Sequence, residues 1–196
     1  ERVLTTDKYA HAMQPAGDHQ HDAHVWMDPL AAAAFAERVA VALGEIRPAH
    51  AAQWRDNAAA LRQRLQALDA ELRSAVTRPA SPGPANQGYL VSHDAFAPFE
   101  SRYGLRHMAA LSDGEERPPG PRRIAEIKTM IAGGAITCVM LEPHYDRKIV
   151  ETGVGDAGIR RITADAMAQS VPANTEGLEV FYRGLGRSFA ECLASE

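Results

Sequence analysis

The sequence predicts an α/β protein in which a parallel sheet carries helices on both faces. Three observations support this fold class. Strand-like apolar segments alternate with amphipathic helical segments beyond residue 88. A long helix with one apolar stripe precedes them, and a segment rich in proline and glycine separates the two regions.

The first part of the chain predicts two helices after an irregular segment. Residues 1–23 show no periodicity and are expected to form a loop, and "HVW" (24–26) is expected to be a short strand end. Asp28 and the proline after it predict a helix start, because the carboxylate caps free N–H groups and proline loses no hydrogen bond there. Pro48 begins a second helix, predicted over 48–77, whose leucines recur at intervals of three and four.

The second part predicts the sheet. The segment 78–87 contains closely spaced prolines and marks the one internal boundary that the sequence indicates. Four strand-like segments follow within 88–196, namely "YLVS", "MAAL", "ITCVML" and "IRRIT". Helical segments lie between them, as in a four-stranded parallel sheet with helices on both faces.

Composition excludes several classes of protein. The 196 residues are 45% hydrophobic and 23% charged, with a formal net charge of -4, so no basic footprint for nucleic acid is present. No apolar run is long enough to span a membrane. Because the first residue is Glu1 and not methionine, we expect a processed or truncated product. Cys138 and Cys192 form either one disulfide or two reduced core thiols.

Metal-ligand side chains follow the predicted strands. His24, His93 and Asp165 are of the types that zinc binds, whereas manganese favours more oxygen ligands. Asp94 and Glu142 also follow strands, at the sheet edge where functional groups of α/β proteins collect. Each has a simpler interpretation: the histidines as loop residues bonded to backbone carbonyls, Glu142 as a turn residue, and Asp94 and Asp165 as caps.

Catalytic motifs give little support for an enzyme. The sequence has no GxSxG, phosphate-binding loop, HExxH or dinucleotide fingerprint. Ser92, His93 and Asp94 are consecutive, so their side chains diverge and cannot form a relay. A zinc-dependent hydrolase with Glu142 as its base remains an alternative.

Three further histidines, His11, His19 and His21, are grouped in one segment near the start of the chain. This segment is either one that attracts metal ions or only a polar loop.

Several blocks in order resemble one family. "HVWMDPLAAAAFAERVAVAL", "VSHDAFAPFESRYGL", "PPGPRRIAEIKTMI", "CVMLEPHYDRKIVET" and "FYRGLGRSFAECL" resemble the ZnuA-type substrate-binding proteins, the zinc and manganese receptors of bacterial ABC importers. The resemblance covers residues 22–196. It implies two α/β lobes joined by a long helix, with the metal bound between the lobes.

The resemblance implies a division of the chain. Residues 1–23 would be a histidine-containing loop, 24–47 the end of the N-terminal lobe, 48–77 the connecting helix, 78–87 a linker and 88–196 the C-terminal lobe. A complete member would carry most of the first lobe ahead of Glu1, so we expect that the N-terminal part is missing and that this chain begins with a remnant of the first lobe.

The resemblance also assigns roles to residues. His24 and His93 match ligand positions, and an imidazole at His93 favours zinc over manganese. Asp165 falls at a carboxylate position, although "ADAMA" departs there from the family's L-D-P-L-G. The remaining implied roles are an auxiliary metal loop (His11, His19, His21), supporting contacts to the ligands (Glu142, Asp94) and a disulfide (Cys138, Cys192).

The implied function is transport. The chain would be a periplasmic, monomeric, non-enzymatic receptor that captures Zn²⁺ and delivers it to the membrane permease of an ABC importer. It would have no nucleic-acid partner and no membrane span of its own. The alternatives are the zinc-dependent hydrolase and a metal-binding adhesin of the same fold.

Overall fold

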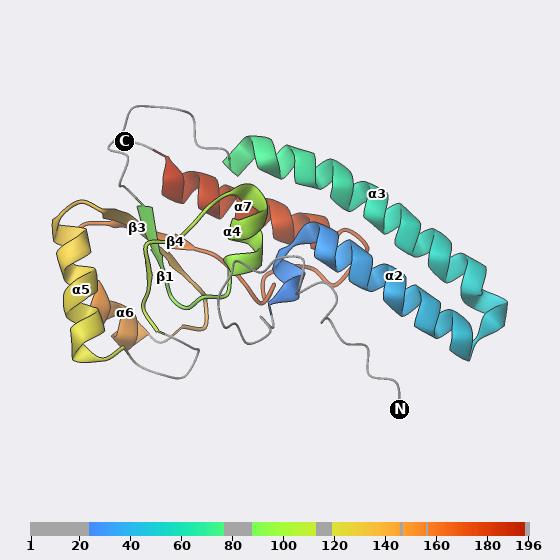
Figure 1. Ribbon diagram of the computed structural model, residues 1–196, viewed down its shortest axis with the longest axis horizontal. Helices are drawn as coiled ribbons and strands as arrows, with labels where there is room; N and C mark the ends of the chain where they lie inside the picture. The colour runs from blue at the N-terminus through green and yellow to red at the C-terminus, as the bar shows by residue number, and fades with distance from the viewer. Residues whose placement is uncertain (1–23, 77–87, 113–118, 146, 156, 195–196) are drawn as a thin grey trace.

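The computed structural model describes residues 24–76, 88–112, 119–145, 147–155 and 157–194. Its elements (Figure 1) are η2 (Val25–Met27), α2 (Pro29–Ile46), η3 (Pro48–His50), α3 (Ala51–Val76), β1 (Gly88–Val91), α4 (Ala97–Tyr103), β2 (Ala109–Ala110), α5 (Pro121–Ala132), β3 (Ile136–Leu141), α6 (Arg147–Gly153), β4 (Arg160–Thr163) and α7 (Gly177–Leu193). None of the helices in these ranges is long and apolar enough to cross a membrane.

The predicted four-stranded parallel sheet is confirmed. Its strand order is β2-β1-β3-β4, and each neighbouring pair is parallel. In the register, Leu90 of β1 lies opposite Ala109 on one side and Val139 on the other. Because all four strands run the same way, their carboxyl ends meet at one edge of the sheet.

Helices cover both faces of the sheet, as the sequence predicts. Alternate residues of each strand point to opposite faces. Tyr89, Val91, Cys138, Met140 and Ile162 pack into the larger core with α3, α4 and α7, and Leu90, Ala109, Ile136 and Val139 pack into the smaller core toward α5 and α6. Figure 1 shows α5 and α6 on the opposite side of the sheet from α7.

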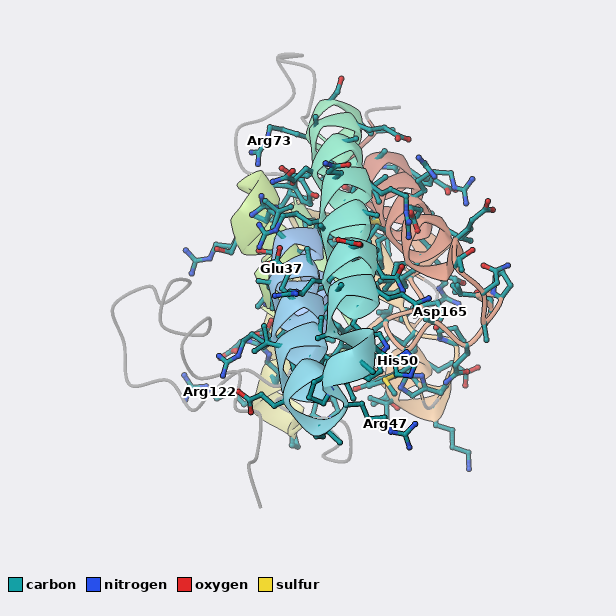
Figure 2. The ribbon with its side chains drawn as sticks, turned by 90° about the vertical axis from the view of Figure 1, so that its right-hand side faces the viewer. Glu37, Arg47, His50, Arg73, Arg122 and Asp165 are labelled. Carbon is teal, nitrogen blue, oxygen red and sulfur yellow. A yellow bond between two sulfur atoms is a disulfide. The ribbon has the colours of Figure 1, made fainter. Side chains whose placement is uncertain are left out.

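The long helix α3 carries the predicted apolar stripe. Leu65, Leu68, Leu72 and Val76 are buried in the larger core. Figure 2 shows α3 between α2 and α7, and the close approach to α7 depends on a glycine. A Cβ added to Gly186 would lie 2.5 Å from Cδ2 of Leu72, so a larger residue at this position would displace the Leu72 side chain or the helix that carries it.

The segment predicted as a strand end is a 3-10 turn instead. Met27 N–H donates to the carbonyl of His24 at 2.9 Å, which closes the turn Val25–Met27. Asp28 then caps α2, as predicted, and its carboxylate accepts from Leu30 N–H at 2.7 Å. The cap draws the backbone into the helix directly after the turn, so this short run does not extend as a strand.

Helix α6 ends at Gly153. Gly155 and Gly158 both have positive φ angles, which glycine adopts readily and which a helix cannot contain. The chain therefore turns there toward β4.

The disulfide Cys138–Cys192 is present. It joins the central strand β3 to the last turn of α7, with the two Cα atoms 5.6 Å apart. The bridge fixes α7 against the face of the sheet that also receives α3.

Candidate metal centre

Polar side chains gather where β1 and β3 end. Ser92 and His93 follow β1, and Glu142 follows β3, its neighbour in the sheet. Ser92 N–H donates to the carbonyl of Met140 at 3.1 Å, which extends the pairing of the two strands by one residue. The sheet therefore determines where these three side chains lie, and all three are buried.

Glu142 connects these residues. Its Oε1 accepts a hydrogen bond from Ser92 Oγ at 2.8 Å and lies 2.5 Å from Nδ1 of His93. Its Oε2 lies 3.6 Å from Nε2 of His144, which is partly exposed. A carboxylate next to one ring nitrogen of a histidine selects the tautomer that leaves the other nitrogen available to a metal ion.

The two histidines predicted as ligands lie together. The ring centroids of His24 and His93 are 5.5 Å apart, although all of α2, α3 and β1 lies between the two residues in the sequence. His93 is buried and His24 is half-buried. Two imidazoles from separate segments at a sheet edge are a suitable start for a zinc site.

Two hydrogen bonds hold the turn that carries His24. Tyr182 Oη, from the buried face of α7, donates to the carbonyl of Trp26 at 2.6 Å. Trp26 Nε1 donates to the carbonyl of Ala166, just beyond β4, at 3.0 Å. Both contacts attach η2 to the sheet lobe, so the position of His24 depends on α7 as well as on α2.

Asp165 lies beyond the end of β4, but its carboxylate is bound by its own loop. Oδ2 accepts from the backbone N–H and the hydroxyl of Ser170, each at 2.8 Å. Burial alone would raise the pKa of Asp165, but these bonds and those from the backbone of Gln169 and Met167 hold it below the ordinary value. His24, His93 and Asp165 do not bring their ligand atoms within 4.8 Å of one another, so Asp165 as third ligand remains a prediction.

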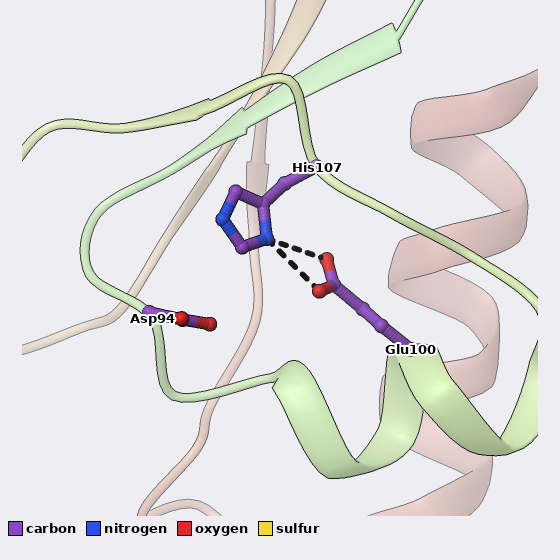
Figure 3. Close-up of side chains that lie close together, drawn as sticks. All are labelled: Asp94, Glu100 and His107. Atoms are coloured by element: carbon purple, nitrogen blue, oxygen red, sulfur yellow. Dashed lines mark hydrogen bonds and ion pairs between the residues drawn. The ribbon is translucent and has the colours of Figure 1, made fainter. Parts of the chain in front are cut away.

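Asp94 is not the N-cap of α4, and its predicted role as a supporting contact to His93 stays a prediction. The N-cap of α4 is Phe96, which makes no side-chain capping bond. The carboxylate of Asp94 instead lies near Glu100 of α4 and His107, the residue before Met108 and β2, as Figure 3 shows. Among the described ranges this is the group of three ligand-type side chains whose ligand atoms all lie within 4.8 Å of one another.

The comparisons with known proteins identify the family of the chain. The profile of the family described as "Zinc-uptake complex component A periplasmic" (ZnuA) matches residues 2–187. The chain belongs to the ZnuA family. The high-affinity zinc uptake system protein ZnuA of Brucella suis is 32% identical over 175 residues, which are 89% of this chain and 51% of that protein. The chain thus spans about half the length of the curated relatives that it matches.

Solved structures show the same fold at low sequence identity. The AdcAII protein of Streptococcus pneumoniae is 22% identical, with a TM-score of 0.77 over 97% of this chain and 70% of that chain. The laminin-binding protein Lmb of Streptococcus agalactiae, described as a bifunctional protein with adhesin and metal transporting activity, is 20% identical, with a TM-score of 0.76 over 93% and 70% of the two chains.

Sequence reasoning did not predict the contact between Glu100 and His107. Glu100 lies in a segment with the pattern of an amphipathic helix, and His107 lies just before a predicted strand. Nothing in their spacing indicated that the two side chains are in contact. The available signal was a glutamate on the buried side of α4, next to Phe99, because a buried carboxylate requires a partner. The predicted metal loop of His11, His19 and His21 lies outside the described residues.

Proposed function

We propose that this chain captures Zn²⁺ as part of a receptor that delivers the ion to an ABC importer. The observation that carries the proposal is the contact of Glu142 with His93, 2.5 Å from carboxylate to Nδ1, beside the ring of His24. In this arrangement Nε2 of His93 faces the cation, and Glu142 orients the ring. Membership of the zinc-uptake family and the zinc-uptake names of its relatives support the choice of cargo.

Zinc is favoured over manganese by the donor set. Zinc is borderline-soft and accepts imidazole nitrogen in tetrahedral sites, whereas manganese prefers oxygen donors. The nitrogen donors of the proposed site are two imidazoles, one buried (His93) and one half-buried (His24). Asp165 would complete the shell through Oδ1, which is buried without a hydrogen-bond partner, while Oδ2 keeps its bonds from Ser170.

The other parts of the proposal follow from the same family. The receptor acts as a monomer in the periplasm, its partner is the membrane permease of the importer, and it has no catalytic activity. Residues 24–47 form the end of the N-terminal lobe, 48–77 the connecting helix, 78–87 a linker and 88–196 the C-terminal lobe, while 1–23 supply an auxiliary histidine loop.

Calorimetric titration of the chelator-stripped chain tests the proposal. Zinc should bind more tightly than manganese, and His93→Ala should remove the tight zinc site. The matched control is a chain with both His19→Ala and His21→Ala, which should keep that site. If the control loses as much affinity as His93→Ala, the histidine segment binds the metal and the proposal fails.

The hydrolase alternative has its own test. A zinc hydrolase with Glu142 as base would turn over ester or peptide substrates when loaded with zinc, and Glu142→Ala would abolish that turnover. A receptor should show binding without turnover. Sustained turnover by the parent chain that disappears in Glu142→Ala would overturn the transport proposal.

A further inference from the structure

We propose that Asp94, Glu100 and His107 form a second binding site for Zn²⁺, separate from the His24–His93 pair. The two carboxylates and the imidazole come from three segments: the turn after β1, helix α4 and the approach to β2. One imidazole with two carboxylates is a ligand set that zinc accepts, with water in the remaining position. The site depends only on these residues and does not require the function proposed above.

The distances suit one shared cation. Nδ1 of His107 lies 3.1 Å and 2.9 Å from the two carboxylate oxygens of Glu100. Two donors that each lie about 2.0 to 2.2 Å from one tetrahedral zinc ion are about 3.3 to 3.6 Å apart, a few tenths of an ångström more than these contacts. A cation can therefore take the place of the proton between His107 and Glu100 with little movement of either side chain. The ligand atom of Asp94 already lies within 4.8 Å of both, and its exposed side chain can close the remaining gap.

Glu100 is held in place by a residue outside the cluster. Tyr89 Oη, buried in the larger core, donates to Oε1 of Glu100 at 2.5 Å. Burial and the charge of Glu100 raise the pKa of Tyr89, so its hydroxyl stays protonated and remains a donor. This bond orients the carboxylate and leaves Oε2 directed toward the cation, as outer hydrogen bonds do for metal-ligating carboxylates.

His107 is also fixed by its backbone. The N–H of Met108, the next residue, donates to the carbonyl of Tyr89 at 2.8 Å, which places His107 at the end of the pairing between β1 and β2. The α4 helix ends at Gly104, and Leu105 N–H donates to the carbonyl of Glu100 at 2.8 Å. The strand pairing and the helix end therefore set the geometry of this pair before any cation binds.

Asp94 adds a second carboxylate beside the pair of His107 and Glu100. Burial alone would lower the pKa of His107, but the hydrogen bond and charge of Glu100 and the charge of Asp94 hold it above the ordinary value. The same two carboxylates that favour a positive charge on the imidazole would favour a divalent cation at this place, and Glu100 is only 4% exposed.

The second site adjoins the first through the backbone. Asp94 directly follows His93, and the two side chains point to different partners: His93 to Glu142, Asp94 to the Glu100–His107 pair. A cation on Asp94 would restrain the turn that also carries His93, so occupancy of the second site would help to fix a ligand of the first.

The test counts zinc ions bound per chain by calorimetry, in a background in which His11, His19 and His21 are replaced by serine. Asp94→Asn and His107→Gln should each bind one zinc ion fewer than this parent. His50→Gln, which removes an exposed histidine of η3, is the matched control and should bind as many ions as the parent. Asp94→Asn alters an exposed side chain, so its result does not depend on a change in folding.

A second readout separates this site from the first. In the His93→Ala variant, zinc should still shift the imidazole NMR signals of His107, and adding Asp94→Asn should abolish the shift. Failure of His93→Ala to lose an ion would count against the receptor proposal but not against this one. The second site would be overturned if Asp94→Asn and His107→Gln both bound as many zinc ions as the parent and zinc did not shift the imidazole NMR signals of His107.

Discussion

Glu142 Oε1 lies 2.5 Å from Nδ1 of His93, and the same oxygen accepts the hydroxyl hydrogen bond of Ser92. The carboxylate reaches this position because β1 and β3 are neighbours and both end at the same edge of the sheet. The contact therefore couples the orientation of a predicted ligand to the pairing of two buried strands.

Glu142→Gln should weaken zinc binding by about 10- to 100-fold without unfolding the chain. The amide keeps the shape of the side chain but loses the charge that fixes the His93 tautomer, and losses of such outer contacts typically have this size. Competition with a chromophoric chelator measures the affinity. Glu126→Gln, on the exposed side of α5, is the control and should bind like the parent. Equal affinities for all three proteins would show that Glu142 does not act on His93.

Gly186→Ala should destabilise the fold by about 1 to 3 kcal/mol, the usual range for overpacking a core. The added methyl would meet Cδ2 of Leu72 at 2.5 Å, between α7 and α3. Gly184→Ala is a matched control in the same helix, because a Cβ there meets nothing within 4 Å. Alanine at that position should stabilise the chain by about 0.5 to 1 kcal/mol.

Urea unfolding with chelator present measures both changes. The critical result is that the two variants change the free energy of unfolding in opposite directions, since both replace a glycine of the same helix by alanine. If Gly186→Ala is as stable as Gly184→Ala, then α3 and α7 do not pack as closely as the structure has them.

The Cys138→Ser and Cys192→Ser double variant should lose about 2 to 4 kcal/mol of stability. The bridge closes a loop of 54 residues between β3 and α7, and breaking it frees the unfolded chain. Unfolding of the parent with and without reductant gives an independent measurement. Reductant should leave the double variant unchanged, and a parent that is equally insensitive to it would indicate that the bridge does not form.

Local sequence signals predicted much of the fold. The strand-like runs, the leucine stripe of α3 and the Asp28 cap depend on neighbouring residues, and each was identified from them. The turn Val25–Met27 was wrongly predicted as a strand end, because three residues are too few to show a period and the capping of α2 decides their conformation.

The site was predictable only in part, because it depends on which strands are neighbours. The rule that functional groups follow parallel strands selected His93 and Glu142, but their contact requires β1 and β3 to be adjacent, which no local pattern reveals. The approach of His107 to Glu100 is harder still, since it depends on the orientation of the short helix α4. Asp165 as a ligand stays a prediction.

Asp69→Asn should lower the free energy of unfolding by about 1 to 2 kcal/mol at neutral pH, near the lower end of the range for hydrogen bonds to charged groups. Asp69 of α3 accepts hydrogen bonds from Arg102 of α4 at 2.7 Å and 3.1 Å, and Arg102 also reaches the carboxylate of Asp28. Burial alone would raise the pKa of Asp69, but the bonds from Arg102 and the charges of Arg102 and Arg73 hold it below its ordinary value.

The sign of the pH dependence follows from that depressed pKa. The contribution of Asp69 is fully present above the unfolded-state pKa of about 3.9 and is lost as the pH falls through the lower folded-state value. The stability difference between the parent and Asp69→Asn should therefore be constant from pH 7 to pH 5 and should shrink below about pH 4. Urea unfolding at a series of pH values measures it. Asp56→Asn, an exposed site on the same helix, should show no such difference, and a gap for Asp69→Asn that grew in acid would contradict the assigned ion pair.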